Sequence, residues 1–164
     1  MKIGVDGGGT KTECILVDAG GTIVARHLAP GCNPSIAGPG QARLVVTDAL
    51  CALAASLNSQ PSTHGQAPRI SSTLLCMAGN RGFWSEFAAT LTDFGHVTAW
   101  DDSVPVLELA THGAPGLVLH GGTGSFVAAR APDSTIHYAG GLGWRFADPG
   151  SGYELGRRAI SRAL

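Results

Sequence analysis

The stretch that decides the fold is Ile3-Gly4-Val5-Asp6-Gly7-Gly8-Gly9-Thr10-Lys11-Thr12-Glu13-Cys14-Ile15-Leu16-Val17-Asp18, in which a glycine turn joins two apolar runs of strand type. Glycine has no Cβ and adopts unusual dihedral angles cheaply, so such a turn opens its backbone N–H groups to a charged ligand. Thr10, Lys11 and Thr12 add hydroxyl and ammonium groups, and Asp6 adds a carboxylate suited to magnesium. The stretch predicts a phosphate-binding β-hairpin, although a glycine-rich hairpin without a ligand stays open as the alternative.

Two other phosphate-binding motifs are excluded by the residues that follow the glycines. The Rossmann fingerprint and the P-loop both lead directly into a helix. Here the glycines are followed by Glu13-Cys14-Ile15-Leu16-Val17, a run of strand type, and Gly20-Gly21 follows shortly after it. The local pattern is therefore strand, turn, strand.

The composition describes a globular chain with ample material for a core. Its 164 residues are 44% hydrophobic and 14% charged, with a formal net charge of −1. This length corresponds to one domain, or one and a part. A charge near zero provides no electrostatic attraction for nucleic acid or an anionic membrane, so we expect neither as a partner.

The cysteines and the amino terminus bear on the cellular compartment. Cys14, Cys32, Cys51 and Cys76 are widely spaced and form no C-x-x-C pair, so we interpret them as small buried thiols. The chain runs from Met1-Lys2 straight into the first strand without a signal peptide, and no apolar run approaches the roughly 18 residues that span a bilayer. These features predict a cytoplasmic location.

Residues 20 to 57 continue the first hairpin. Gly20-Gly21 turns the chain into a third strand over 22–27, which completes an antiparallel meander. The segment 29–35 contains two prolines, so we expect it to leave the sheet as an ordered loop that presents Asn33, with an ordinary turn asparagine as the alternative. Pro39 suits the first turn of a helix over about 39–57.

Residues 70 to 111 then alternate strand and helix patterns. We expect a buried parallel strand over 70–77, a helix over 83–91, a short strand over 96–100 and a helix from Ser103 to about Thr111. The small residues 78–82 leave room for a ligand at the carboxyl end of their strand. Asp101-Asp102 follows the last strand, where carboxylates serve either chemistry or helix capping.

The hairpin construction recurs in the second half of the chain. Leu117-Val118-Leu119-His120 enters the turn Gly121-Gly122-Thr123-Gly124-Ser125, and Phe126-Val127-Ala128-Ala129-Arg130 leaves it. Two such turns are more specific than one, because clamping the phosphates of a nucleotide from two lobes needs this duplication.

The closing stretch places an acidic turn before a last helix. Ser151 and Glu154 have the spacing of a capping box, so Ser151 is the expected N-cap. Asp148 lies outside that box, which leaves its carboxylate for a ligand. We expect the helix to continue to Leu164, with Leu155, Ala159, Ile160 and Ala163 on its apolar face.

Taken in order, these motifs resemble the N-acetylglucosamine kinase and BadF/BadG-type ATPase family within the actin-like sugar kinase superfamily. The resemblance implies an α/β fold: a ribonuclease-H-like lobe with a mixed five-stranded sheet over residues 1–114, and the start of a second such lobe over 115–164. It also implies ATP and Mg²⁺ as cofactors and a small-molecule amino sugar as the substrate. The reaction would be phosphoryl transfer to a sugar hydroxyl.

The same resemblance implies roles for individual residues. Asp102 matches the base toward the sugar hydroxyl, and Asp6 the metal position. The phosphate-binding positions are Asp6, Gly7, Gly8, Gly9, Thr10, Lys11 and Thr12 in the first turn, and Gly122, Thr123, Gly124 and Ser125 in the second. The substrate-binding positions are Asn33, Asp102, Thr123, Gly141, Leu142 and Asp148. Leu142 stands where the family often has tryptophan, and Ala147 replaces a glycine, so recognition of the N-acetyl group departs from the family pattern.

Two alternatives to an active kinase stay open. One is a non-catalytic sugar-binding or regulatory remnant of such a kinase. The other is the ATPase activator of an iron–sulfur dehydratase, which would bring cluster-binding cysteines. The adenine-binding segment expected later in the second lobe is not among the 164 residues. We therefore expect a homodimer or a separate second-lobe segment as partner, and no useful ATP turnover by these residues alone.

Overall fold

The computed structural model describes residues 1–59, 69–143, 146 and 148–164, and it divides into two compact units, Met1–Asp102 and Ser103–Leu164. The division lies earlier than the expected boundary after residue 114. The reason is that helix α4 (Ser103–Thr111) packs against strands of the second unit. Each unit is described by itself.

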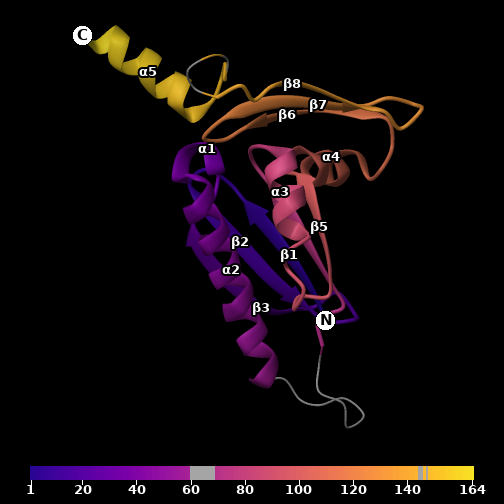
Figure 1. Cartoon of the computed structure of the whole chain (residues 1–164). Coiled ribbons are helices and arrows are strands. Elements are labelled where there is room, and N and C mark those ends of the chain that lie inside the picture. Colours follow the sequence, from indigo (N-terminus) through magenta and orange to yellow (C-terminus); the bar gives the residue numbers. More distant parts are fainter. Residues whose placement is uncertain (60–68, 144–145, 147) are drawn as a thin grey trace. The chain divides into compact units, whose positions relative to one another are not determined.

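Unit 1 is built on a five-stranded mixed sheet with the order β3-β2-β1-β4-β5 (Figure 1). Its strands are β1 (Lys2–Gly7), β2 (Lys11–Val17), β3 (Ile23–Pro30), β4 (Ser72–Met77) and β5 (His96–Asp101). The first three form the expected antiparallel meander, and β4 and β5 run parallel to β1. The predicted mixed sheet and its buried parallel strand are confirmed.

Strand β3 is longer than the sequence suggested. We expected Ala29 and Pro30 to leave the sheet, but Pro30 pairs with Lys11 at the end of the β2–β3 ladder. Because β3 is an edge strand, a proline there removes a donor without breaking the interior of the sheet. Its carbonyl oxygen also accepts a hydrogen bond of 2.8 Å from the Thr12 hydroxyl.

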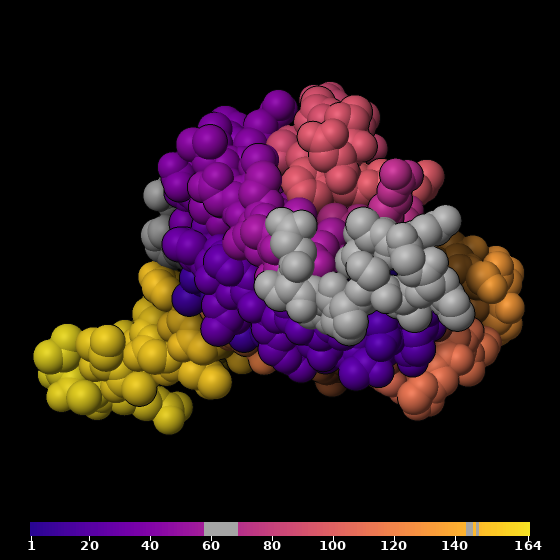
Figure 2. Space-filling model, turned by 90° about the horizontal axis from the view of Figure 1, so that it is seen from below, coloured from indigo at the N-terminus to yellow at the C-terminus, as the bar shows by residue number. Residues whose placement is uncertain are grey.

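The helices of unit 1 pack on one face of the sheet and form the main core with it. They are α1 (Pro34–Ala37), α2 (Pro39–Ala55), the 3₁₀ turn η1 (Ser56–Ser59) and α3 (Arg81–Ala88). In the space-filling view of Figure 2, the purple atoms of α1 and α2 lie to one side of the indigo atoms of the first strands. Trp84 of α3 is 1% exposed, and its indole N–H donates to the carbonyl of Ala78 at 2.9 Å. This contact fixes the start of α3 to the end of β4.

Unit 2 contains a smaller antiparallel sheet. Its strands are β6 (Gly116–Gly121), β7 (Ser125–Arg130) and β8 (Ile136–Gly140), in the order β6-β7-β8, and its helices are α4 and α5 (Gly152–Ala163). Leu107 of α4 packs with Phe126 and Ala128 of β7 in a small core. Strand β8 had not been predicted. None of the residues of α5 is buried.

The model also bears on membrane insertion. Among the described parts of the chain, every helix is too short or too polar to cross a bilayer.

Candidate functional site

The first glycine turn closes a tight hairpin between β1 and β2. Gly7 and Thr12 form the last pair of the ladder, and the Gly8 N–H donates to the Lys11 carbonyl at 3.0 Å. The Gly8 carbonyl accepts the N–H groups of Cys32, at 3.0 Å, and Asn33, at 3.2 Å. These bonds confirm the predicted hairpin and tie its turn to the loop after β3.

The glycines of this turn are required by space. A Cβ on Gly7 would overlap the Met77 methyl group and lie 2.8 Å from the Cys32 sulfur. A Cβ on Gly31, in the facing loop, would overlap the Gly9 carbonyl. Gly7, Gly8 and Gly9 all lack a positive φ, so the expectation of unusual dihedral angles was wrong. Close packing, rather than backbone strain, explains Gly7 in the turn and Gly31 in the facing loop.

The three polar residues of the turn differ in what they can contact. Thr10 and Lys11 are exposed, and the Lys11 ammonium lies 3.6 Å from a carboxylate oxygen of Glu13. Thr12 is fully buried, and its hydroxyl donates the hydrogen bond to the Pro30 carbonyl described above. A direct phosphate contact would require Thr12 to give up that bond, so its observed role is to hold β2 against β3.

Two carboxylates approach the same thiol at the carboxyl ends of β1, β4 and β5. Asp6 pairs with Cys76 in the β1–β4 register, and Cys76 pairs with Trp100 in the β4–β5 register. Burial, followed by the negative charges of Asp6 and Asp102, raises the pKa of the Cys76 thiol to about 11. The Asp6–Cys76 pair lies on the sheet face opposite to the main core, and Asp102 lies near enough for its charge to act on the same thiol.

The neighbouring Asp101 has a different environment. It pairs with Met77 in the β4–β5 register, and Met77 belongs to the core face that carries the helices. The Arg81 Nε–H donates to Asp101 Oδ2 at 3.1 Å, and the Asp101 side chain is only 16% exposed. Sequence reasoning had not singled out Arg81, because an arginine at the start of a helix is an unremarkable pattern.

Asn33 serves as the N-cap of the short helix α1. Its Oδ1 accepts the Ser35 N–H at 3.0 Å. A Cβ on Gly79, whose φ is +103°, would lie 3.0 Å from the same oxygen. Asn33 thus caps a turn through its Oδ1, and it also lies against the segment that follows β4.

The second glycine turn is built jointly with the segment 148–152. Gly121 and Ser125 form the last pair of the β6–β7 ladder, and the Gly122 N–H donates to the Gly124 carbonyl at 2.8 Å. The Gly152 N–H in turn donates to the Gly122 carbonyl at 2.8 Å. The Ser125 hydroxyl donates to the Pro149 carbonyl at 2.9 Å. Two separate motifs of the sequence therefore form one structure.

The Asp148 carboxylate already accepts a hydrogen bond from the protein, whereas we expected it to be available to a ligand. Its Oδ1 accepts the Gly143 N–H at 3.2 Å, and a Cβ on Gly124 would lie 3.0 Å from its Oδ2. Gly141 has a φ of +65° and lies against the Tyr138 hydroxyl, while Leu142 is 66% exposed. Ala147 lies outside the described residues.

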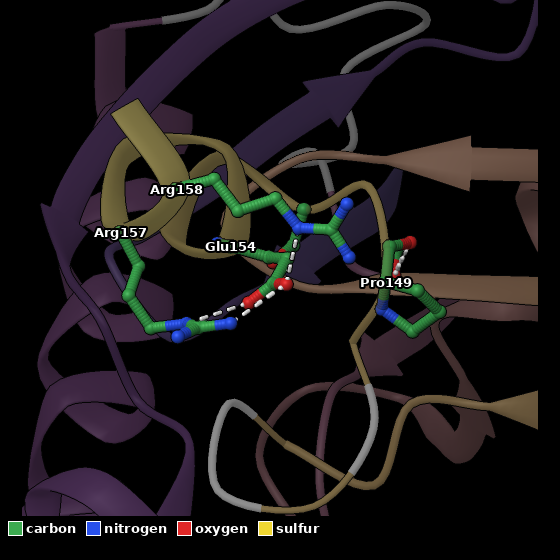
Figure 3. Close-up of polar contacts among 6 residues, drawn as sticks. Pro149, Glu154, Arg157 and Arg158 are labelled. Atoms are coloured by element: carbon green, nitrogen blue, oxygen red, sulfur yellow. Dashed lines mark hydrogen bonds and ion pairs between the residues drawn. The ribbon is translucent and has the colours of Figure 1, made fainter. Parts of the chain in front are cut away.

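The start of α5 confirms half of the predicted capping box. The Ser151 hydroxyl accepts the Glu154 N–H at 3.2 Å. The Glu154 carboxylate pairs with Arg157 at 2.9 Å and with Arg158 at 2.7 Å, as Figure 3 shows. Hydrogen bonds from Arg157 and then Arg158 lower the pKa of Glu154 to about 2.

The carboxylates of unit 1 suit a hard cation. Across the described residues, no group of three or more His, Cys, Asp or Glu side chains is placed to hold a metal ion. Magnesium usually keeps several waters and binds one or two carboxylates together with substrate phosphates. Asp6 and Asp102 match that donor set.

Comparisons with known proteins identify the family. The model of the BadF/BadG/BcrA/BcrD ATPase family matches residues 3–164, so the chain belongs to this family. It is 26% identical to an N-acetyl-D-glucosamine kinase of Dictyostelium discoideum, covering 99% of the chain and 53% of that protein. The resemblance stated from the sequence is confirmed.

Solved structures agree with this assignment. A candidate N-acetylglucosamine kinase from Chromobacterium violaceum matches with a TM-score of 0.73 and 29% identity, over 98% of this chain and 55% of that one. A second, from Porphyromonas gingivalis, matches with a TM-score of 0.77 and 21% identity over the same shares. The chain thus spans about half the length of these relatives. The expected α/β fold of actin-like sugar kinases is confirmed.

Proposed function

We propose that this chain carries the acceptor-activating part of an ATP-dependent amino sugar kinase, which phosphorylates N-acetylglucosamine or glucosamine. The observation that carries the proposal is the register that places Asp6 beside Cys76 next to the first glycine turn, with the charge of Asp102 acting on the same thiol. A phosphate-binding turn next to two carboxylates is what phosphoryl transfer to a hydroxyl requires. The N-acetylglucosamine kinases among the relatives support the choice of substrate.

In this proposal the residues of unit 1 position the reactants. The exposed side chains of Thr10 and Lys11 bind phosphoryl oxygens, together with N–H groups of the turn. Asp102 accepts the proton of the attacking sugar hydroxyl, and its carboxylate orients that hydroxyl. Asp6 would hold Mg²⁺, whose charge neutralises the phosphoryl oxygens. Asn33 acts as a sugar contact through the part of its amide that does not cap α1.

The residues of unit 2 have corresponding proposed roles. The turn of Gly122, Thr123, Gly124 and Ser125 is the second phosphate loop, and Gly141 and Leu142 contact the sugar. Asp148 positions the second phosphate loop and the segment around Gly143, because its carboxylate accepts a hydrogen bond from the Gly143 N–H and lies against Gly124. A cytoplasmic location and a partner that supplies further second-lobe residues stay predictions.

Binding and turnover measurements on the purified chain test this function. We expect calorimetry to detect binding of N-acetylglucosamine or glucosamine to the chain alone, and a coupled assay with Mg-ATP to detect sugar-dependent ADP release once the partner that supplies further second-lobe residues is present. Asp102→Asn should lower kcat by roughly 10²- to 10⁴-fold, the usual contribution of a general base, while sugar affinity changes little. Asp48→Asn, on the exposed side of α2, is the matched control. Full turnover in Asp102→Asn, or binding of neither sugar nor Mg-ATP, would contradict the proposal.

A further inference from the structure

The segment that follows β4, residues 78–81, contacts three parts of the candidate site in unit 1. The Ala78 N–H donates to the Gly7 carbonyl at 2.8 Å, next to the first glycine turn. Gly79 lies against Asn33, and Arg81 forms an ion pair with Asp101. A short segment thus links the phosphate turn, the Asn33 loop and the end of β5.

The end of β5 is paired with a neighbouring strand on one side only. β5 is an edge strand with β4 as its neighbour, and Asp101 forms the last pair of that ladder. Asp102 follows this pair and is the last residue of unit 1. Its backbone therefore continues directly from the residue that Arg81 holds.

Arg81 is itself held firmly. It is the first residue of α3, whose N-cap Asn80 accepts the Phe83 N–H at 3.0 Å. Trp84, in the same first turn of α3, is buried in the core, and its indole N–H donates a hydrogen bond to the Ala78 carbonyl. Because its base is fixed on both sides, the Arg81 guanidinium can fix the partly buried carboxylate of Asp101.

Successive side chains of a strand point to opposite faces. Asp101, the last residue of β5, faces the core with Met77, whereas Cys76 faces the other side; Asp102 follows in the turn after the strand, and its charge contributes to the raised pKa of Cys76. We propose that Arg81 is a positioning residue, which acts through its ion pair with Asp101 to aim Asp102 at the acceptor hydroxyl. This role rests on the proposed function, since Asp102 is the base of that reaction.

Amide hydrogen exchange and kinetics on matched variants test the proposal. Arg81→Ala and Asp101→Asn should both speed exchange at residues 100–103, by about tenfold. They should also lower kcat by roughly 10- to 100-fold, the cost of misplacing a reacting group, with the KM for ATP nearly unchanged. Arg81→Lys, which keeps the charge, should recover part of the loss. The control is Arg43→Ala in α2, because the Arg43 guanidinium also contacts α3, over the rings of Phe83 and Phe87.

The outcomes separate this role from a structural one and from the proposed function. Unchanged exchange at residues 100–103 in Arg81→Ala would overturn the proposal, and so would faster exchange with an unchanged kcat. Equal losses in Arg43→Ala and Arg81→Ala would indicate a general disturbance of α3 and would also overturn it. Absence of sugar-dependent turnover by the unaltered chain together with its second-lobe partner would count against the proposed function alone, because exchange tests the ion pair without substrate.

Discussion

The hydroxyl of Ser125 donates a hydrogen bond of 2.9 Å to the carbonyl oxygen of Pro149, 24 residues further along the chain. With the bond from Gly152 to Gly122, it makes the second glycine turn and the start of α5 a single structure. A substitution in the second glycine turn should therefore also affect the stability of the start of α5.

Ser125→Ala should destabilise unit 2. The substitution removes the donor and leaves the Pro149 carbonyl without this bond, which costs about 1–2 kcal/mol for a largely buried group. Urea denaturation monitored by circular dichroism would measure the loss. Ser161→Ala, on the exposed side of α5, is the control and should change stability by only a few tenths of a kcal/mol. Equal stability of both variants would show that the Ser125 bond contributes nothing.

Gly7→Ala should destabilise unit 1 through overpacking. The added methyl group would meet Met77 and Cys32, both buried, so neighbours must shift at a cost of about 1–3 kcal/mol. Gly40→Ala in α2 is the matched control, because nothing lies within 4 Å of a Cβ there. Thermal unfolding of the two variants gives the comparison. If Gly7→Ala is as stable as Gly40→Ala, the glycine is not required by space.

Much of unit 1 could be predicted because its signals are local. The apolar runs on both sides of the glycine turn, and the continuous run ending at Met77, specify strands whatever their surroundings. Pro30 was misjudged because its effect depends on strand position. A proline ends an interior strand but is tolerated at the edge, and the edge position of β3 is a tertiary fact.

The sequence proposes candidate site residues but does not reveal the hydrogen bonds around them. Asp6 and Asp102 were both named as candidates, yet only the register of β1 and β4 places Asp6 beside Cys76, and only the fold brings the charge of Asp102 near the same thiol. The sequence did not reveal the partner of Asp148, because Gly143 donates its hydrogen bond through the backbone N–H, a group that almost every residue type carries. Long-range contacts of this kind carry no signal in a single sequence.

The pH dependence of α5 should follow Glu154. Its folded-state pKa is lowered from 4.5 to about 2, so its contribution is present above pH 4.5 and is lost as the pH falls toward 2. Exchange of the α5 amides, corrected for the intrinsic rate, should therefore accelerate across that window. Glu154→Gln should abolish this dependence, whereas Glu86→Gln on α3 should retain it. Acid-dependent exchange that persists in Glu154→Gln would assign the effect to another group.

Sugar preference should depend on Leu142, which is 66% exposed and stands where the family often has tryptophan. If the proposed function holds, the unaltered chain should bind glucosamine and N-acetylglucosamine with similar affinity. Leu142→Trp should then favour N-acetylglucosamine about fourfold, since burying one methyl group against the indole contributes about 0.8 kcal/mol. Leu109→Trp, at an exposed position on α4, is the control and should leave the ratio unchanged. Competition calorimetry measures the ratio, and a strong preference for the N-acetylated sugar in the unaltered chain would mean that another side chain recognises the acetamido group.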